Sequence, residues 1–147
     1  MKALLQRVSQ ASVTNNGVVE GSITRGIVIL LGVAQGDTED DAQYLAQKIM
    51  NLRIFPDEQG KFNISALDIQ GELLVISQFT LMANTKKGHR PSFTEAASPD
   101  EAKALFEHFM EVLRASRLKV EKGGFRQHLV VEIHNDGPVT IFLDSKA

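Results

Sequence analysis

Residues 27–33 read Ile-Val-Ile-Leu-Leu-Gly-Val, an unbroken apolar run. Successive side chains of a β-strand point to opposite faces, so a strand of this composition is buried on both of them. We therefore expect it to lie at the centre of a sheet. Loosely alternating segments precede it at 2–8, 11–14 and 18–24, and Asn15-Asn16-Gly17 supplies the positive φ angles of a tight hairpin turn. The beginning of the chain is thus predicted to be a strand meander.

Two amphipathic helices are expected to lie on this sheet. Thr38 can cap the first helix, acidic residues fill its first turn, and apolar residues recur at i, i+4 and i+7, namely Leu45, Ile49 and Leu52. Ser98 can cap the second helix, which has Pro99 at its first position and a wide apolar face over 105–113.

The remaining strands define the fold class. Short strands at 53–55 and 61–64 flank a turn-forming loop, Leu73–Ile76 is apolar throughout, and the last strands are predicted at 118–121, 127–133 and 139–143, the final two joined by a Gly-Pro turn. The sequence therefore predicts an α+β fold, a largely antiparallel, barrel-like β-sheet with two main helices packed on it. The 147 residues, 43% of them hydrophobic, suffice for a single domain, 1–147, with one core.

The composition excludes several classes of protein. Without cysteine the chain has no disulfide, no thiolate nucleophile and no Cys-ligated zinc. A net charge of −2 gives no global positive field, so any nucleic-acid contact should be local and no DNA partner is expected. Charged residues interrupt every apolar run well before the roughly 20 residues of a membrane span, and the first residues lack a signal-peptide pattern. We expect a cytoplasmic protein with no membrane partner.

Polar residues end the apolar strand at 73–76, in the motif Ser77-Gln78-Phe79-Thr80-Leu81. If the extended geometry continued, Ser77 and Phe79 would point to one face and Gln78 and Thr80 to the other. These side chains could satisfy backbone groups where the ladder stops. Alternatively, the backbone N–H groups of Phe79 and Thr80 point into a pocket, ready to stabilise an oxyanion, with Gln78 positioning the substrate.

A second motif, Asn135-Asp136-Gly137-Pro138-Val139-Thr140, precedes the last strand. Its composition favours a turn, and the isomer of the Gly137-Pro138 bond is open at this stage.

Other patterns are weaker. His128, Glu132 and His134 alternate on one predicted strand, which could be a metal site but is more typical of one wet face. Ser116-Arg117-Leu118-Lys119 fits S-x-x-K by letter only, and no Ser-His-Asp arrangement can be placed. A loop at 86–90 carries three fixed positive charges, on Lys86, Lys87 and Arg90. It is either a solvated loop or a local contact for nucleic acid.

Together, the two motifs resemble the two signatures of the D-aminoacyl-tRNA deacylase family. Further similar segments stand in the same order: Gln6-Arg7-Val8, Ala11-Ser12-Val13, Arg53-Ile54-Phe55 and Gly88-x-Arg90-Pro91-Ser92-Phe93. The resemblance covers almost the whole chain. It implies a homodimeric cytosolic esterase that releases D-amino acids, and glycine, from tRNA, with no cofactor and no metal.

The resemblance also implies roles for individual residues. Gly137 and Pro138 would form a cis dipeptide that reaches into the partner subunit's pocket and excludes L-side chains, braced by Arg7. The pocket floor would consist of Ser77, Gln78, Phe79 and Thr80. We further predict that the acceptor-end phosphates of tRNA are contacted by Lys86, Lys87 and Arg90. One segment departs from the Phe-Gly-Ala-x-Met pattern that relatives commonly carry, namely Phe125-Arg126-Gln127-His128-Leu129.

Two mechanisms fit a site without a catalytic triad. In one, the enzyme holds the activated ester, backbone N–H groups stabilise the oxyanion, and the ribose 2′-hydroxyl assists the attacking water. In the other, the Thr80 hydroxyl is the nucleophile. Two functions from other classes also remain: a non-catalytic RNA-end binding module, and an oligomeric structural protein whose Gly-Pro turn seals a subunit interface.

Overall fold

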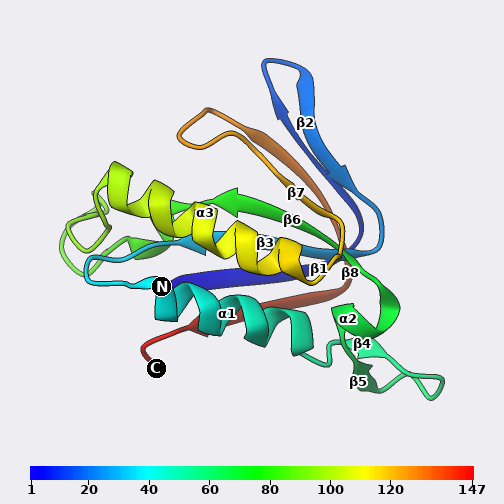
Figure 1. Ribbon diagram of the computed structural model, residues 1–147. Helices are drawn as coiled ribbons and strands as arrows, with labels where there is room; N and C mark the ends of the chain where they lie inside the picture. Colours follow the sequence, from blue (N-terminus) through cyan, green and yellow to red (C-terminus); the bar gives the residue numbers. More distant parts are fainter.

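The computed structural model describes residues 1–147 as a curled β-sheet with helices on one face (Figure 1). The elements are, in chain order, β1 (Lys2–Asn15), β2 (Val18–Ile23), β3 (Gly26–Gly32), α1 (Glu39–Asn51), β4 (Phe55–Pro56), β5 (Phe62–Ile64), α2 (Ala66–Ile69), β6 (Glu72–Ser77), the 3₁₀-helix η1 (Phe79–Met82), α3 (Pro99–Ala115), β7 (Val120–Lys122) and β8 (Val130–Asp144).

The main sheet has the order β2-β1-β3-β6-β7, and β8 pairs with the other edge of β1. All pairings of β1 are antiparallel, whereas β6 is parallel to both β3 and β7. The sheet curls until β2 approaches β7, where a Cβ added to Gly21 would lie 3.2 Å from the Glu121 Cβ. Glycine allows this close approach. The predicted α+β fold with a largely antiparallel, barrel-like sheet is confirmed, with two parallel pairings within it.

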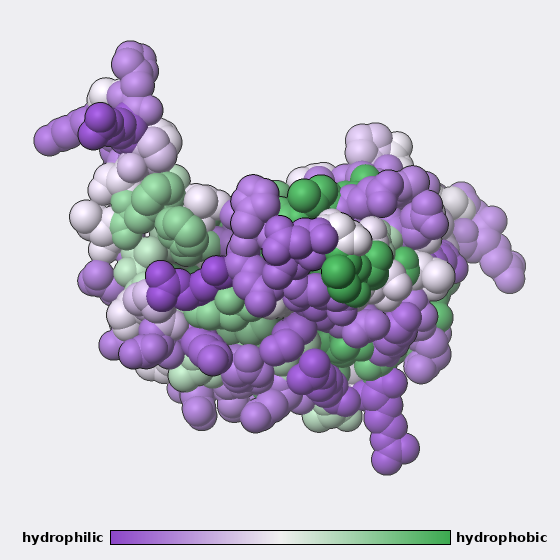
Figure 2. Space-filling view, turned by 90° about the horizontal axis from the view of Figure 1, so that it is seen from above, coloured by the Kyte–Doolittle hydropathy of each residue, from purple (hydrophilic) through white to green (hydrophobic).

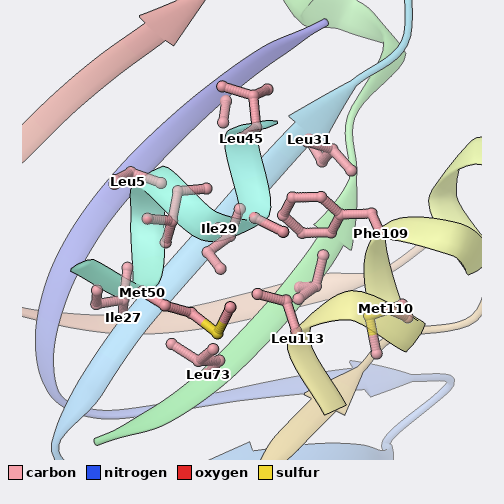
Figure 3. Packing of buried hydrophobic residues seen from close by; sticks show 14 of the residues in the cluster. Leu5, Ile27, Ile29, Leu31, Leu45, Met50, Leu73, Phe109, Met110 and Leu113 are labelled. Carbon is pink, nitrogen blue, oxygen red and sulfur yellow. The ribbon is translucent and has the colours of Figure 1, made fainter. Parts of the chain in front are cut away.

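Both main helices begin where the sequence predicts. The Thr38 N–H donates to Asp41 Oδ2 at 2.8 Å at the start of α1, and the Glu101 N–H donates to Ser98 Oγ at 3.4 Å at the start of α3. Their apolar faces meet the sheet in a core cluster of 22 buried residues. Figure 3 shows how side chains from β1, β3 and β6 interdigitate with those of the two helices, among them Leu5, Ile29, Leu73, Met50 and Phe109.

A second, smaller cluster lies on the other face of the sheet. Its seven buried residues come from β1, β2, β3 and β6, and partly buried residues of the 129–133 segment cover them, namely Leu129, Val131 and Ile133. The central strand β3 is therefore buried on both faces, as its apolar sequence indicates. The helices cover one face, and the curled part of the sheet covers the other.

The prediction of two final strands joined by a Gly-Pro turn was wrong. β8 is one strand that pairs with β1 along its length, with Thr140 opposite Gln6 and Asn135 opposite Val8. The four residues between Asn135 and Thr140 bulge out. The bulge closes on itself, because the Val139 N–H donates to Asn135 Oδ1 at 2.7 Å and Asn135 Nδ2 donates to Thr140 Oγ1 at 2.9 Å. The chain therefore resumes its direction instead of reversing.

Three smaller differences concern two strand boundaries and one additional helix. The segments predicted separately at 2–8 and 11–14 form the single strand β1, and the strand predicted at 127–133 begins only at Val130. The short helix α2, which Ser65 caps by accepting from the Asp68 N–H at 3.1 Å, was not predicted. No helix is both long enough and apolar enough to cross a membrane.

Candidate active site

A cavity of about 540 Å³ lies where β6 ends. Three parts of the chain enclose it: the end of β6 with the start of η1, the loop and first turns leading into α3, and the segment 124–129. Its lining consists of Val33, Ser77, Gln78, Phe79, Ala96, Ala97, Pro99, Ala102 and residues 124–129. Its volume falls in the range typical of small-molecule sites. Three of the four residues predicted to form a pocket floor therefore do line a cavity, and Thr80 directly follows them.

The backbone turns sharply at this point because the β6 ladder ends. The Gln78 N–H donates the last bond to Leu31 O at 2.7 Å, and η1 then begins at Phe79. The extended geometry considered for Ser77–Thr80 is thus not continued beyond Gln78. Since the first N–H groups of a helix have no intrahelical acceptor, those of Phe79 and Thr80 are available for another partner.

Side-chain contacts fix the turn. Gln78 Nε2 donates to the Thr80 hydroxyl oxygen, which ties the two side chains together. The Phe79 ring is 57% exposed and meets the Phe93 ring edge-on, with centroids 5.0 Å apart. This contact connects η1 to the loop that leads into α3.

The cavity wall contains no acid–base pair. Its only titratable side chains are those of Arg126 and His128, and no Asp or Glu belongs to the lining. His128 lies in the loop before β8, so it does not share a strand face with Glu132 and His134 as predicted. His134 instead lies near Glu132, with Nε2 to Oε1 at 3.7 Å. No three His, Cys, Asp or Glu side chains come together in a metal-binding arrangement.

The second motif forms the bulge of β8. The Gly137-Pro138 peptide bond is cis, and Gly137 has φ +139°. Arg7 of β1 holds the bulge, because its Nε donates to Asp136 O at 2.9 Å and its Nη1 donates to Ile54 O at 2.7 Å. The guanidinium also lies 5.4 Å from the centre of the exposed Phe62 ring. Arg7 therefore joins the bulge to the β4–β5 region.

Within one chain the bulge and the cavity lie apart. Neither Gly137 nor Pro138 lines the cavity. Arg7, opposite the bulge, pairs with Ile27 of β3, whereas Ser77 pairs with Leu31 of the same strand. Four residues of strand correspond to roughly 13 Å, and three strand spacings across the sheet add roughly 14 Å at right angles. One protomer therefore does not bring the two motifs together.

The basic loop, defined as residues 85–91, is closed at its base beside the cavity. Asn84 and Ser92 exchange backbone hydrogen bonds of 2.8 and 2.9 Å, and the chain then passes Phe93 before Ala96 and Ala97 reach the cavity wall. Its cationic residues, Lys86, Lys87 and Arg90, are all exposed. In Figure 1 this loop lies at the left end of the molecule, and Figure 2 shows strongly hydrophilic side chains projecting from the same end.

A family model described as D-Tyr-tRNA(Tyr) deacylase matches residues 4–144. The chain belongs to this family. A D-aminoacyl-tRNA deacylase of Thermotoga petrophila is 55% identical over 145 residues, which are 99% of this chain and 97% of that relative. One of Dehalococcoides mccartyi is 56% identical over 146 residues, covering 99% and 95% of the two chains. Membership makes the chain a hydrolase of aminoacyl-tRNA ester bonds, which confirms the resemblance on which its expected function was based.

Solved structures support the fold. The protein named c-Myc DNA Unwinding Element Binding Protein superposes with a TM-score of 0.94 at 43% identity, with both chains covered completely. A probable eukaryotic D-amino acid tRNA deacylase superposes with a TM-score of 0.81 at 17% identity, covering 97% of each chain, and shows that the fold persists in distant proteins of this kind.

Some of this deacylase's cavity wall was not predicted from the sequence. Ala96, Ala97 and Ala102 carry no recognisable chemical signal, since alanine is common on any helix or loop. The segment 125–129 drew attention because it departs from the family pattern and because His128 was a possible metal ligand, and the departure was the one signal that pointed to the wall.

Proposed function

We propose that this chain hydrolyses D-aminoacyl-tRNA, and glycyl-tRNA, in the cavity at the end of β6, giving free amino acid and tRNA without a side-chain nucleophile. The observation that carries the proposal is the cavity itself: the Ser77-Gln78-Phe79 strip lines it, and its wall holds no acid–base pair. The proposal places the enzyme in the cytoplasm, where aminoacyl-tRNA is made and used.

An aminoacyl ester is already activated, so positioning and charge stabilisation can supply most of the catalysis. Water attacks the ester carbonyl carbon, and the terminal ribose 2′-hydroxyl assists by taking up the water's proton and passing it to the departing 3′-oxygen. The N–H groups of Phe79 and Thr80 stabilise the negative charge on the tetrahedral intermediate. No cofactor or metal ion takes part in this scheme.

The alternative, with Thr80 as nucleophile, has less support. The Thr80 hydroxyl accepts from the Gln78 amide, and neither a histidine nor a carboxylate is hydrogen-bonded to it. A threonine hydroxyl needs an adjacent base to become a nucleophile. Thr80 is therefore assigned a positioning role, in which its hydroxyl orients the Gln78 side chain toward the substrate.

Chirality is proposed to be read by the Gly137-Pro138 bulge of a second copy of the chain. The bulge is exposed, rigidly held by Arg7, and too far from the cavity of its own protomer to act there. Rejecting L-isomers by about 10⁴ requires about 5.5 kcal/mol of discrimination, more than one lost methyl contact supplies. Backbone that collides with an L-side chain is the better device.

A partly exposed apolar strip, in which Phe142 is exposed and Leu4 and Leu30 are half-buried, supports the homodimer. Leu4 pairs with Leu30 on one side and with Phe142 on the other, so the three side chains point to one face of the sheet. Their neighbours Leu5 and Ile29 point to the opposite, helix-covered face. Phe142 is 52% exposed in the single chain. A second copy placed on this face would cover the strip and bring its own β8 bulge across.

The deciding experiment follows the loss of the ester from matched D- and L-aminoacyl-tRNA. We expect rapid release of the D-amino acid and of glycine, with the L-substrate spared. Binding without release would indicate an RNA-end binding module instead. No interaction would indicate a structural protein.

DNA binding has one point in its favour, the name of the solved relative at 43% identity. The net charge of −2, with only three of the 16 Lys and Arg residues gathered in the basic loop, speaks against a DNA duplex as the main partner. We expect the protein to bind duplex DNA weakly, at low salt and without sequence preference, and to bind aminoacyl-tRNA tightly. The reverse order of affinities would favour the DNA function.

A further inference from the structure

Arg126 occupies an unusual place in the cavity wall. It belongs to the segment 124–129, which closes the cavity opposite the start of η1. Its backbone has φ +59°, in the left-handed region that few non-glycine residues adopt. Residues with such backbone angles cluster at functional sites, so the position of Arg126 in the cavity wall indicates a role in binding.

The guanidinium of Arg126 has no partner within the chain. None of the ion pairs involves it, and no hydrogen bond from its side chain is present. The surrounding contacts are made by its neighbours instead: the Gly124 N–H donates to Glu20 Oε2 at 2.7 Å, and Gln127 Oε1 accepts from Asn15 Nδ2 at 2.8 Å. These bonds anchor the segment to the β1–β2 hairpin, so Arg126 is carried on a fixed support with its charge uncompensated.

The electrostatic character of the cavity follows from these residues. Arg126 carries the only permanent charge in the lining, and no carboxylate opposes it. A guanidinium presents its N–H groups as a planar fork that matches an oxyanion, whether a carboxylate or a phosphate.

We propose that Arg126 is a specificity-determining residue that binds an oxyanion carried by the aminoacyl-tRNA. That oxyanion is either the side-chain carboxylate of an acidic D-amino acid or a phosphate of the terminal nucleotides. The inference rests on the proposed deacylase function of the same cavity, and it assigns this chain a preference that a neutral residue at position 126 would not give.

The experiment compares kcat/KM on tRNA esterified with D-Asp, with D-Asn, which has nearly the same shape without the charge, and with D-Ala. Arg126→Gln removes the charge and keeps much of the length, and Arg126→Lys retains the charge. Arg117→Gln is the matched control, because Arg117 is also exposed and has φ +71° but lies outside the cavity lining.

Two outcomes support the proposal and identify the oxyanion. If it is the side-chain carboxylate, the wild type prefers D-Asp over D-Asn by about ten-fold or more, and Arg126→Gln abolishes the preference. If it is a phosphate, Arg126→Gln lowers kcat/KM by a similar factor on all three substrates and makes the salt dependence shallower. In either case Arg126→Lys restores part of the loss, and Arg117→Gln has no effect.

Other outcomes overturn it. The role of Arg126 is refuted if the wild type shows no preference among the three substrates and Arg126→Gln has a kcat/KM within about two-fold of the wild-type value on each. The deacylase function stands in that case. Should Arg126→Gln fail to fold, Arg126→Ala replaces it in the same comparison, and a value within about two-fold of the wild type on all three substrates refutes the role equally. A wild type that releases none of the three removes both proposals together.

Discussion

Replacing Gly137 by alanine perturbs the proposed chiral gate at its centre. A Cβ at this position would lie 2.8 Å from Val139 Cγ2 and 3.0 Å from Arg7 Nη2, and φ +139° is a backbone angle that L-residues rarely adopt. Contacts this short force the neighbouring atoms to move by several tenths of an ångström. Arg7 Nε donates to Asp136 O in the bulge, and its Nη1 donates to Ile54 O. A shift of the guanidinium therefore also displaces the backbone of the gate.

The expected effect is large on selectivity and moderate on stability. A displacement of about 1 Å at a positioning group can cost about 100-fold, so we expect the ratio of D to L kcat/KM to change by at least about ten-fold. Backbone strain should lower the free energy of unfolding by about 1–3 kcal/mol. The assay measures ester loss from matched D- and L-aminoacyl-tRNA, and urea unfolding reports the stability.

Gly60→Ala separates these two effects. Gly60 also has positive φ, +77°, but no atom lies within 4 Å of an added Cβ, so the substitution displaces no neighbouring group. This variant should lose stability and keep its D/L ratio. If Gly137→Ala keeps the wild-type ratio and rate on both isomers, the bulge does not act as the gate.

Three further predictions test other parts of the account. Thr80→Ala should retain at least about a tenth of the wild-type kcat, because it loses only one hydrogen bond to the Gln78 amide. If Thr80 were the nucleophile, its removal would lower kcat far more. An acyl-enzyme trapped in the wild type would contradict this prediction. Neutralising the three cationic residues of the basic loop together should reduce the slope of log affinity for tRNA against log salt, and an unchanged slope would remove these residues from the tRNA contact. Burial alone would raise the pKa of Asp41, but hydrogen bonds from the Thr38 N–H, Ser145 and Lys146 outweigh it and lower the pKa from 3.8 to about 2. The depressed pKa stabilises the fold above pH 4, and this contribution, up to about 2 kcal/mol, is lost as the pH falls through 2; Asp41→Asn should therefore be less stable at neutral pH and equal to the wild type near pH 1, as thermal unfolding can show.

Local patterns were sufficient to predict the central strand and the two main helices. The short apolar run at 27–33 favours a strand buried on both faces, and Thr38 and Ser98 each stand at the position where a helix begins. These features depend on side-chain period and capping within a few residues, which a sequence displays directly.

The bulge of β8 could not be predicted in the same way. Asn-Asp-Gly-Pro is compatible with a reversing turn and with a bulge, and the choice depends on pairing with β1, more than a hundred residues earlier in the chain. The Asn135 side chain, which closes the bulge by bonding to Val139 and Thr140, would equally suit a turn. Long-range strand pairing therefore decides the local structure here.

The site was predictable in part for a similar reason. The Ser77-Gln78-Phe79 strip stands out because polar residues interrupt an apolar strand, and it does line the cavity. Another part of the wall consists of small residues before and within α3, whose side chains show no pattern of their own. Their position becomes functional only because α3 and the end of β6 meet in the folded chain.

Isolated heterodimers test the cross-subunit gate most directly. One subunit carries Gly137→Ala and the other carries Gln78→Ala with Phe79→Ala, and two different affinity tags allow the mixed dimer to be purified. If the floor of each site comes from one subunit and its gate from the other, the mixed dimer contains one intact site out of two. It should then recover about half of the wild-type D-specific activity. Activity no higher than that of the better parent variant, or a protein that forms no dimer at all, would contradict the account.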